Sequence, residues 1–386
     1  MTRIAQVRSR VLNVSAKANW FFVELRAQDG GVAWGEASLN GREPELEQAT
    51  ARAAAQCVGL SFEEAGRRLR VDANAAGGLV ESAVVSALQQ ALLSATALRH
   101  GVPAHALLGP QVRSSVTAYA NINRATSQRD PAGFVATARR ARQRGFSAFK
   151  AAPFDGVTPQ NGASAEGRGL IHHGIDCLLA LRDAIGPAAR LMVDCHWRFD
   201  EATAVRILRA LAPAHLHWFE CPLPETPAHW PALRRIRAAA REQGVLLAAA
   251  ETQVGVAAFQ TLFDEALYDV VMPDVKYCGG PREMLLIAQR AVEAGVQFSP
   301  HNPTGPICSQ HSLHVAAVAP ECDMLELQFD ESPLFDSLVG SRNPVLVDGK
   351  LIVSSSEGLG LAIDEAVLAA HPYRPVPLGI ESVGIG

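Results

Sequence analysis

The sequence predicts an α/β protein in which a closed (β/α)8 barrel carries an added α+β capping domain. Three observations lead to this prediction. The chain has 386 residues, enough for two domains or for one large barrel with additions. Eight short apolar segments recur after about residue 114, mostly separated by one helical stretch each. A doubly wound sheet is the competing architecture, but no GxGxxG motif follows any of these segments.

The N-terminal section contains strands first and helices afterwards. Residues 3–14 and 19–26 are rich in β-forming side chains. Residues 44–70 and 80–98 are alanine-rich or largely apolar and have helical spacing. Strands that precede helices, instead of alternating with them, are typical of an α+β unit. We therefore expect residues 1–115 to form the capping domain.

The next section alternates regularly between apolar segments and helical stretches such as 202–213 and 281–295. Alternation of this kind predicts a parallel sheet, and eight units predict a closed barrel. The eight segments are 116–123, 146–154, 190–196, 216–223, 245–251, 270–276, 296–301 and 324–329. We therefore expect a catalytic barrel over residues 116–343.

Two stretches depart from this alternation. Residues 155–174 are rich in glycine and serine at a place where a strand-to-helix loop is expected, so we predict a long loop over the barrel mouth. Residues 344–386 return to β and turn character and then to a short helical stretch. They are too few for a domain, and we expect them to pack on the cap.

Composition excludes several classes of protein. There are 35 Lys and Arg against 39 Asp and Glu, a net charge of −4 with no dense basic stripe, which argues against nucleic-acid binding. No apolar run approaches the roughly 18–20 residues of a membrane helix, and the N-terminus lacks the core of a secretory signal. Seven cysteines without a CxxC pair fit reduced thiols. We expect a cytoplasmic homo-oligomer without a membrane partner.

Charged residues end most of the predicted barrel strands, where the catalytic groups of a barrel lie. They are Lys150, Asp194, His196, Glu220, Glu251, Asp274, Lys276, His301 and Glu326. Any one carboxylate in such a place is more often a helix cap or an ion-pair partner. However, Asp194, Glu220 and Glu251 end three successive strands. Converging carboxylates repel each other and need a cation, and oxygen ligands favour a hard one such as Mg²⁺.

The order of Asp194, Glu220, Glu251, Asp274 and His301 resembles the enolase superfamily. Within it, the match is to the mandelate racemase-like group, which includes acid-sugar dehydratases. The resemblance covers nearly the whole chain. Four further segments resemble the family. They are 86–109 at the end of the cap, 272–280 and 299–306 on the sixth and seventh strands, and 347–364 in the C-terminal return.

This resemblance implies a modified barrel and a reaction that begins by removing the proton α to a carboxylate. Mg²⁺ held by the three carboxylates would act as a Lewis acid on the substrate carboxylate. His301 paired with Asp274 would be a general acid or base, because a buried carboxylate fixes the imidazole tautomer and raises its basicity. Glu326 matches a glutamate that hydrogen-bonds near the substrate carboxylate.

Two departures from the family's racemases bear on the reaction. Those enzymes carry a Lys-x-Lys pattern at the end of the second strand, whereas this chain has Lys150 followed by two alanines, so that Ala152 replaces the second lysine. The third strand offers Asp194 and His196 in an Asp-x-His pattern, which resembles that of galactonate- and gluconate-type dehydratases. Residues two apart in a strand share a face, so His196 supplies a second acid or base group.

These residues predict a Mg²⁺-dependent hydro-lyase that dehydrates an aldonic or related hydroxy acid to a 2-keto-3-deoxy acid. We assign His196 as base and His301 as acid, and the reverse assignment stays open. Lys150 would bind the substrate carboxylate, act as a base, or simply pair with Asp194. A racemase or epimerase on the same fold is the alternative reaction. A non-catalytic barrel that binds a metal and a ligand is the alternative from another class.

Substrate contacts are predicted from position alone. Trp20 lies in the cap, whose loops close the site in the family. Arg198 and Asn302 each adjoin a proposed catalytic histidine and would contact sugar hydroxyls, or else cap a helix. Lys276 shares a strand face with Asp274 but has no assigned role. His311 and His314 are spaced i, i+3 on a helix, and we expect them at the surface.

Overall fold

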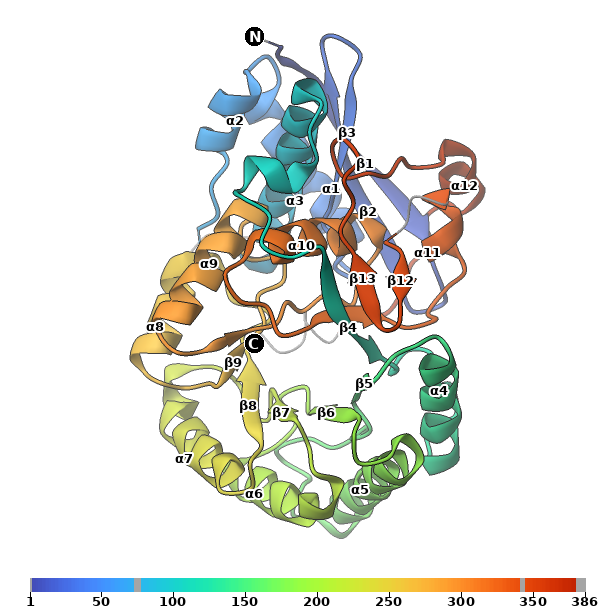
Figure 1. Cartoon of the computed structure of the whole chain (residues 1–386), viewed down its shortest axis with the longest axis vertical. Coiled ribbons are helices and arrows are strands. Elements are labelled where there is room, and N and C mark those ends of the chain that lie inside the picture. The colour runs from blue at the N-terminus through green and yellow to red at the C-terminus, as the bar shows by residue number, and fades with distance from the viewer. Residues whose placement is uncertain (1, 73–77, 341–343, 380–386) are drawn as a thin grey trace.

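The computed structural model describes residues 2–72, 78–340 and 344–379 of the chain. The fold consists of a cap and a barrel, and Figure 1 shows the cap stacked above the ring of strands and helices. The chain enters the barrel at β4 (Ser115–Asn121).

The cap combines one antiparallel sheet, in the order β1-β2-β3, with three helices. Its elements are β1 (Ile4–Asn13), β2 (Asn19–Ala27), β3 (Val32–Glu36), α1 (Glu43–Cys57), α2 (Phe62–Arg68) and α3 (Gly78–His100). Strand β3 lies so close to α3 that a Cβ on Gly35 would come within 1.8 Å of the Ala87 carbonyl oxygen. Only glycine allows this approach.

Helix α3 corrects one expectation about segment length. By length and composition it qualifies as a membrane span, although we expected no segment to approach that size. However, 78% of the most apolar 18-residue stretch of this helix is buried inside the protein. Its apolar side chains form the cap core together with those of the sheet, α1 and α2. Its hydrophobicity is therefore explained by its place as the central helix of the cap.

Eight parallel strands form the barrel, and each overlaps one of the eight predicted segments, which confirms the predicted fold class. After β4 they are β5 (Ala148–Ala151), β6 (Arg190–Asp194), β7 (Trp218–Glu220), β8 (Leu246–Ala249), β9 (Val270–Val271), β10 (Gln297–Phe298) and β11 (Leu325–Gln328). Neighbours pair in sequence order, and β11 pairs with β4. Backbone hydrogen bonds from Asp323 N to Phe298 O (3.1 Å) and from Glu326 N to Pro300 O (3.5 Å) link β10 to β11.

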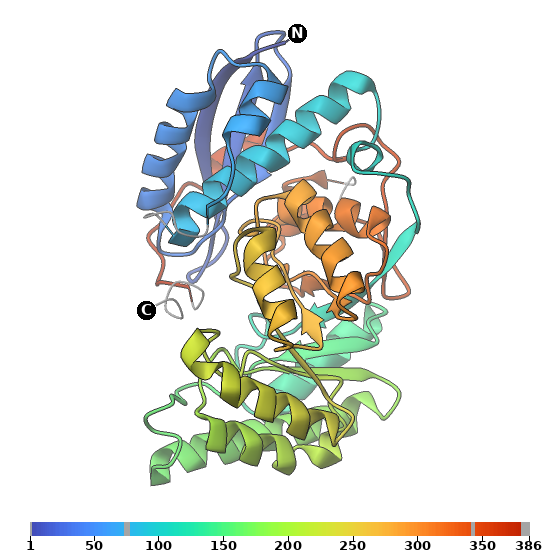
Figure 2. The same cartoon turned by 90° about the vertical axis from the view of Figure 1, so that its left-hand side faces the viewer.

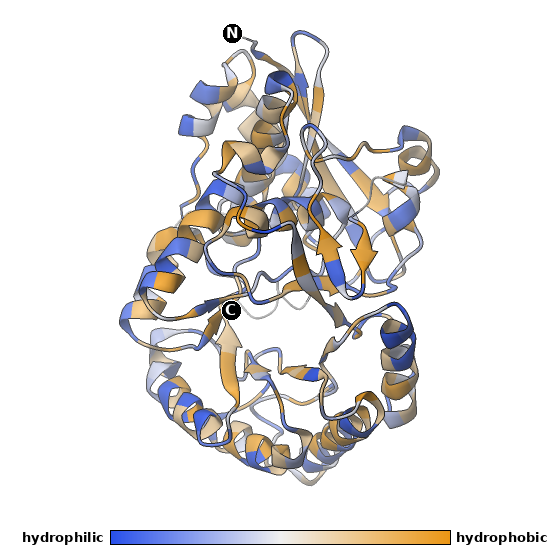
Figure 3. Cartoon of the chain, viewed as in Figure 1, coloured by the Kyte–Doolittle hydropathy of each residue, from blue (hydrophilic) through white to orange (hydrophobic). Residues whose placement is uncertain are grey.

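Helices surround the strands on the outside of the ring (Figure 1). They are α4 (Pro131–Gln143), α5 (Ala165–Ile185), α6 (Glu201–Ala210), α7 (Trp230–Arg241), α8 (Gly255–Asp264), α9 (Pro281–Glu293) and α10 (Pro306–Val318). Figure 3 shows hydrophilic and hydrophobic residues side by side along α4 to α7, as expected of helices with one buried face. Inside the ring, Tyr119, Met192 and Trp218 fill the barrel interior. All seven cysteines are free thiols.

The predicted loop over 155–174 is wrong in its second half, because α5 already begins at Ala165. The hydroxyl of Ser164 caps this helix by accepting a hydrogen bond from Gly167 N. The glycines permit close packing: a Cβ on Gly174 would lie 2.5 Å from the ring of Phe154. The glycine content led us to expect a loop, but the glycines after residue 164 belong to a tightly packed helix.

The surface position expected for His311 and His314 is also wrong. Both lie on α10, where every residue is buried, and both are 0% exposed. Helix α10 is covered by the barrel on one side and by the cap on the other; Figure 2 shows it between the two. Helical spacing of the histidines cannot reveal that a helix is covered all round.

The C-terminal segment contacts both parts of the molecule. The hairpin β12 (Leu346–Val347) and β13 (Lys350–Ile352) pairs antiparallel with β4 of the barrel. Farther on, Leu359 and Leu368 join a buried cluster with Trp20 and Phe22 of the cap. Short helices precede and follow the hairpin: α11 (Leu334–Ser337) and α12 (Glu365–Ala370). The segment therefore ties the cap to the barrel.

Candidate active site

Three carboxylates converge at the ends of neighbouring barrel strands. Asp194 ends β6, Glu220 ends β7 directly opposite it in the ladder, and Glu251 follows β8. One oxygen from each lies within 4.8 Å of the others, and all three residues are at most 4% exposed. The structure thus brings together the three residues that the sequence analysis selected as metal ligands.

The electrostatics of this cluster fit a divalent cation. Burial raises the pKa of Glu220 to about 8; the Lys150 ammonium opposes this shift, and the charges of Asp194 and Glu326 add to it. The cluster therefore holds more negative charge than its surroundings neutralise. A hard cation that favours oxygen ligands would supply the missing positive charge.

Lys150 lies inside the carboxylate cluster and is 1% exposed. Its Nζ is 2.7 Å from Glu220 Oε1 and 2.9 Å from Glu326 Oε1, whereas Asp194 Oδ2 is 3.9 Å away. Burial alone would lower the pKa of Lys150, but the charges of Glu220 and Glu326 raise it well above its ordinary value. Lys150 is thus a fixed cation, and it is closer to Glu220 and Glu326 than to Asp194, the partner named in one of the three roles left open from the sequence.

His301 lies beside Glu251 of the cluster. Its Nδ1 is 2.8 Å from Asp274 Oδ2, and its Nε2 is 3.5 Å from Glu251 Oε2. Asp274 therefore orients the ring so that Nε2 faces the carboxylates. Burial opposes ionisation of Asp274, yet Lys276, whose Nζ lies 2.9 Å from the same Oδ2, and His301 hold its pKa below the ordinary value. Lys276, which had no role in the sequence analysis, thus supports the anionic form of Asp274.

His196 is the second histidine beside the carboxylates. Its Nε2 is 2.9 Å from Asp194 Oδ2, and its backbone N–H donates to Asp194 Oδ1 at 3.0 Å. The side chain is 15% exposed, compared with 4% for His301. Two imidazoles therefore contact the same cluster, one through Asp194 and the other through Glu251.

The remaining predicted site residues have different surroundings. Glu326 accepts hydrogen bonds from Asn121 Nδ2 (2.7 Å) and from the backbone N–H of Asn302 (2.9 Å), besides its ion pair with Lys150. The Asn302 side chain donates to Ser309 Oγ (2.9 Å) and to the Glu326 carbonyl oxygen (3.1 Å). Asn302 thus uses its amide within the protein, beneath Glu326.

Arg198 and Trp20 lie at the margins of this arrangement. The Arg198 guanidinium donates to the Phe154 carbonyl oxygen and is 3.5 Å from Asp155 Oδ1, so it links β6 to the loop after β5. Trp20 is 2% exposed and packs edge-to-face against Phe335, with ring centroids 5.9 Å apart.

Two polar residues near the cluster were missed by the sequence analysis. Asn121 is the last residue of β4 and holds Glu326; the strand-end rule would have found it had the list begun with the first barrel strand. Glu225 follows β7 by five residues and accepts hydrogen bonds from Trp197 and Ala250. No strand-end signal marks Glu225, because it lies in a loop.

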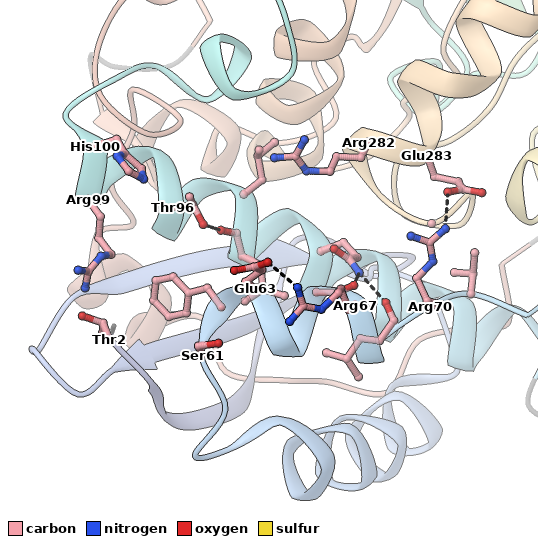
Figure 4. A pocket seen from close by; sticks show the side chains of 18 residues that line it. Thr2, Ser61, Glu63, Arg67, Arg70, Thr96, Arg99, His100, Arg282 and Glu283 are labelled. Carbon is pink, nitrogen blue, oxygen red and sulfur yellow. Dashed lines mark hydrogen bonds and ion pairs between the residues drawn. The ribbon is translucent and has the colours of Figure 1, made fainter.

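A separate cavity of about 680 Å³ lies on the cap, between α2, α3 and the start of α9 (Figure 4). None of the predicted site residues lines it. Arg67 pairs there with Glu63, and Arg70 lies 3.7 Å from Glu283, as the dashed lines in Figure 4 indicate. Because these cations are already paired within the chain, the catalytic chemistry is assigned to the barrel cluster.

The fold and the cluster define a capped barrel enzyme with acid–base groups around a carboxylate centre. The family model "Enolase C-terminal domain-like" matches residues 133–367, well over half of the chain. The chain therefore belongs to the enolase superfamily, in its mandelate racemase-like group.

Proteins similar to this chain align with it over nearly their full length. A D-galactonate dehydratase family member from Streptomyces bingchenggensis is 29% identical, with 96% of this chain and 94% of the relative covered. A Burkholderia xenovorans structure, named as a putative L-alanine-DL-glutamate epimerase and bound to magnesium and fumarate, is 25% identical with a TM-score of 0.86, covering 99% and 98%. A mandelate racemase/muconate lactonizing enzyme structure from Sulfitobacter is 25% identical with a TM-score of 0.84, covering 98% and 97%.

Proposed function

We propose that the protein is a Mg²⁺-dependent acid-sugar dehydratase. The observation that carries the proposal is the pair of histidines at one carboxylate cluster, His196 against Asp194 and His301 against Glu251. Elimination of water needs one group to take the α-proton and another to protonate the departing hydroxyl. The D-galactonate dehydratase family member among the relatives supports the same reaction class.

Asp194, Glu220 and Glu251 would hold the Mg²⁺, and the magnesium in the Burkholderia structure supports this choice of ion. When bound, the ion supplies Lewis-acid stabilisation of the negative charge that develops on the substrate carboxylate. Lys150, fixed among the carboxylates by Glu220 and Glu326, adds a permanent positive charge beside that position. Glu326, held by Asn121 and Lys150, would orient the carboxylate region of the substrate.

The two histidines would divide the proton transfers. In this proposal His196 takes the proton α to the carboxylate at Nδ1, because its Nε2 is hydrogen-bonded to Asp194 Oδ2. The electron pair of that C–H bond moves between the α-carbon and the carboxylate carbon and leaves the negative charge on the carboxylate oxygens. That electron pair then forms the double bond between the α- and β-carbons as the β-carbon–oxygen bond breaks, and His301 Nε2 gives its proton to the departing hydroxyl, which leaves as water. The resulting enol becomes the 2-keto-3-deoxy acid. Asp274 stabilises the imidazolium form of His301 before the transfer.

A racemase or epimerase on the same fold is the second candidate. It is favoured by Lys150, which reaches into the cluster on a different strand from His301 and could return a proton to the opposite face. Against it, position 152, where racemases of this group carry a lysine, is a buried alanine. Dehydration therefore remains the first proposal.

The test is a screen of hydroxy acids, with D-galactonate and D-gluconate among them, for formation of 2-keto acids. We expect turnover of an aldonic acid that depends on added Mg²⁺. Proton NMR in D₂O separates the two reactions. Deuterium incorporation at the α-carbon without net elimination would overturn the dehydratase and favour the racemase.

The same NMR experiment separates the two histidines. If His196 is the base, His196→Asn loses α-proton exchange, whereas His301→Asn keeps exchange and loses elimination. The opposite pattern would reverse the assignment. If no acid in the panel is turned over, and Glu220→Gln changes metal binding only, the non-catalytic barrel is favoured. A cytoplasmic location and a homo-oligomeric state stay predictions.

A further inference from the structure

Four residues with left-handed backbone conformation gather at the ends of three adjacent strands, β6, β7 and β8. They are His196 (φ 48°), Trp197 (φ 56°), Cys221 (φ 44°) and Ala250 (φ 83°). None is glycine, so each conformation is strained and persists only where the surroundings hold it. These residues adjoin the carboxylate cluster in sequence: Cys221 follows Glu220, and Ala250 precedes Glu251.

One side chain, that of Glu225, contacts all three of these strand ends. Its Oε1 accepts hydrogen bonds from the indole Nε1 of Trp197 (3.2 Å) and from the backbone N–H of Ala250 (3.2 Å). The thiol of Cys221 lies 3.8 Å from the same oxygen. On the outer side, Oε2 accepts from Gln253 Nε2 at 3.1 Å. The carboxylate is thus surrounded by donors.

The contacts of Glu225 continue directly to the proposed metal ligands. Ala250, held at its amide, is covalently joined to Glu251. Trp197 follows His196, whose ring contacts Asp194. Cys221 Sγ lies 3.9 Å from Glu251 Oε2, and Trp197 N donates to the Cys221 carbonyl oxygen at 2.6 Å. Fixing these turns therefore fixes the separation between Asp194 and Glu251.

We infer that Glu225 is a positioning residue, whose acceptor oxygens lock the strained ends of β6 and β8 so that Asp194 and Glu251 are held at metal-binding separation. The inference rests on the proposed metal role of these carboxylates. The contacts of Glu225 that carry this effect are those with Trp197, Cys221 and Ala250. Partners of this kind beyond the ligands typically change metal affinity or activity 10- to 100-fold.

Substitutions at Glu225 separate its acceptor role from mere packing. Glu225→Ala leaves the N–H groups of Trp197 and Ala250 without their acceptor. Glu225→Gln keeps one carbonyl oxygen for both, and the Gln253 amide can turn to accept from the new NH₂ group. Asp269→Ala is the matched control: Asp269 also accepts from β8, at Leu247 N (3.0 Å), but it lies at the other end of that strand.

The experiment measures Mn²⁺ affinity of the full chain by electron paramagnetic resonance of the free ion, with no substrate present. We expect Glu225→Ala to weaken Mn²⁺ binding about 10- to 100-fold. Glu225→Gln should stay within about threefold of the parent, as should Asp269→Ala. Circular dichroism and thermal unfolding check that the variants are folded.

Two results would overturn the inference: a folded Glu225→Ala that binds Mn²⁺ as the parent does, or a Glu225→Gln as impaired as Glu225→Ala. If Glu225→Ala fails to fold, Glu225→Gln and Trp197→Phe decide, because the latter removes only the indole N–H. We expect it to weaken Mn²⁺ binding measurably, and an unchanged affinity would refute the inference. Absence of dehydratase activity with normal Mn²⁺ binding would instead refute the proposed function.

Discussion

The protein buries titratable side chains in two different ways. At the barrel cluster, carboxylates, Lys150 and His301 lie within ion-pairing distance of one another, and each group keeps a charged partner. In α10, His311 and His314 are buried as neutral rings: burial lowers the pKa of His311 to about 3 and that of His314 to about 4. His314 Nδ1 faces His105 Nδ1 at 3.1 Å, so one imidazole hydrogen-bonds another.

The difference in charge between the two regions shows which of them can take part in acid–base and metal chemistry. Charges that are kept in a buried cluster can stabilise other charges, including those of a cation and of a reacting carboxylate. The neutral histidines beneath the cap provide shape and, between His314 and His105, a hydrogen bond, but no charge at neutral pH. Substitutions in the first region should therefore change catalysis, whereas those in the second should change stability and its pH dependence.

The strongest test compares one histidine from each region. His301→Asn should lower kcat for the dehydration by about 10²- to 10⁴-fold, the usual contribution of a general acid or base. His311→Asn, an equally buried substitution, should lower the free energy of unfolding and leave kcat nearly unchanged in the folded fraction. Steady-state kinetics with denaturant unfolding measure both quantities. Full activity in His301→Asn would show that the acid–base assignment is wrong.

The next effect concerns acid sensitivity. The unfolded chain binds a proton at His314 near pH 6.5, whereas the folded protein does so only near pH 4, so falling pH favours the unfolded state through this window. The expected loss from this one residue is about 3 kcal/mol between pH 6.5 and pH 4. His314→Asn should therefore show a shallower decline in unfolding free energy. Equal slopes for variant and parent, measured by urea unfolding, would contradict the lowered pKa.

The sequence predicted the carboxylate cluster of the barrel better than the environment of helix α10. All eight barrel strands were located, because alternation of apolar segments and helices is a local signal that survives in the fold. The ends of parallel strands share one rim, so the cluster of Asp194, Glu220 and Glu251 followed from sequence order alone. The position of His311 did not, because burial on all sides of α10 depends on the cap, which is distant in sequence.

Two details of the site were also beyond sequence reasoning, for geometric reasons. Pairing with Asp194 was one of three roles left open for Lys150, but the barrel curvature brings its Nζ closer to Glu220 and to Glu326 of the last strand. Glu225 belongs to a loop, and only the left-handed turns at Trp197 and Ala250 aim their N–H groups at it. Neither pairing has a signature in residue spacing.

Metal binding gives a further contrast between the two regions. Mg²⁺ at a hundredfold excess over its Kd should raise the free energy of unfolding by about 2.7 kcal/mol, because the ion binds only the folded cluster. Glu220→Gln should abolish this gain, and His314→Asn should keep it. Thermal unfolding with and without Mg²⁺ at constant ionic strength measures the gain. An equal increase in Glu220→Gln would place the bound ion elsewhere.

The smallest expected effect is that of substituting Arg198, at the edge of the candidate site. Arg198 is held by the Phe154 carbonyl oxygen and by Asp155, which is half exposed, so Arg198→Ala should cost no more than about 1 kcal/mol of unfolding free energy. If the guanidinium only braces the loop after β5, KM for the sugar acid should change less than about threefold. A large increase in KM with unchanged stability would instead assign Arg198 to substrate hydroxyls. Arg235→Ala is the matched control. It removes a surface ion pair with Glu201, and both residues lie on helices outside the barrel, away from the carboxylate cluster. The comparison between these two arginines therefore separates recognition from bracing.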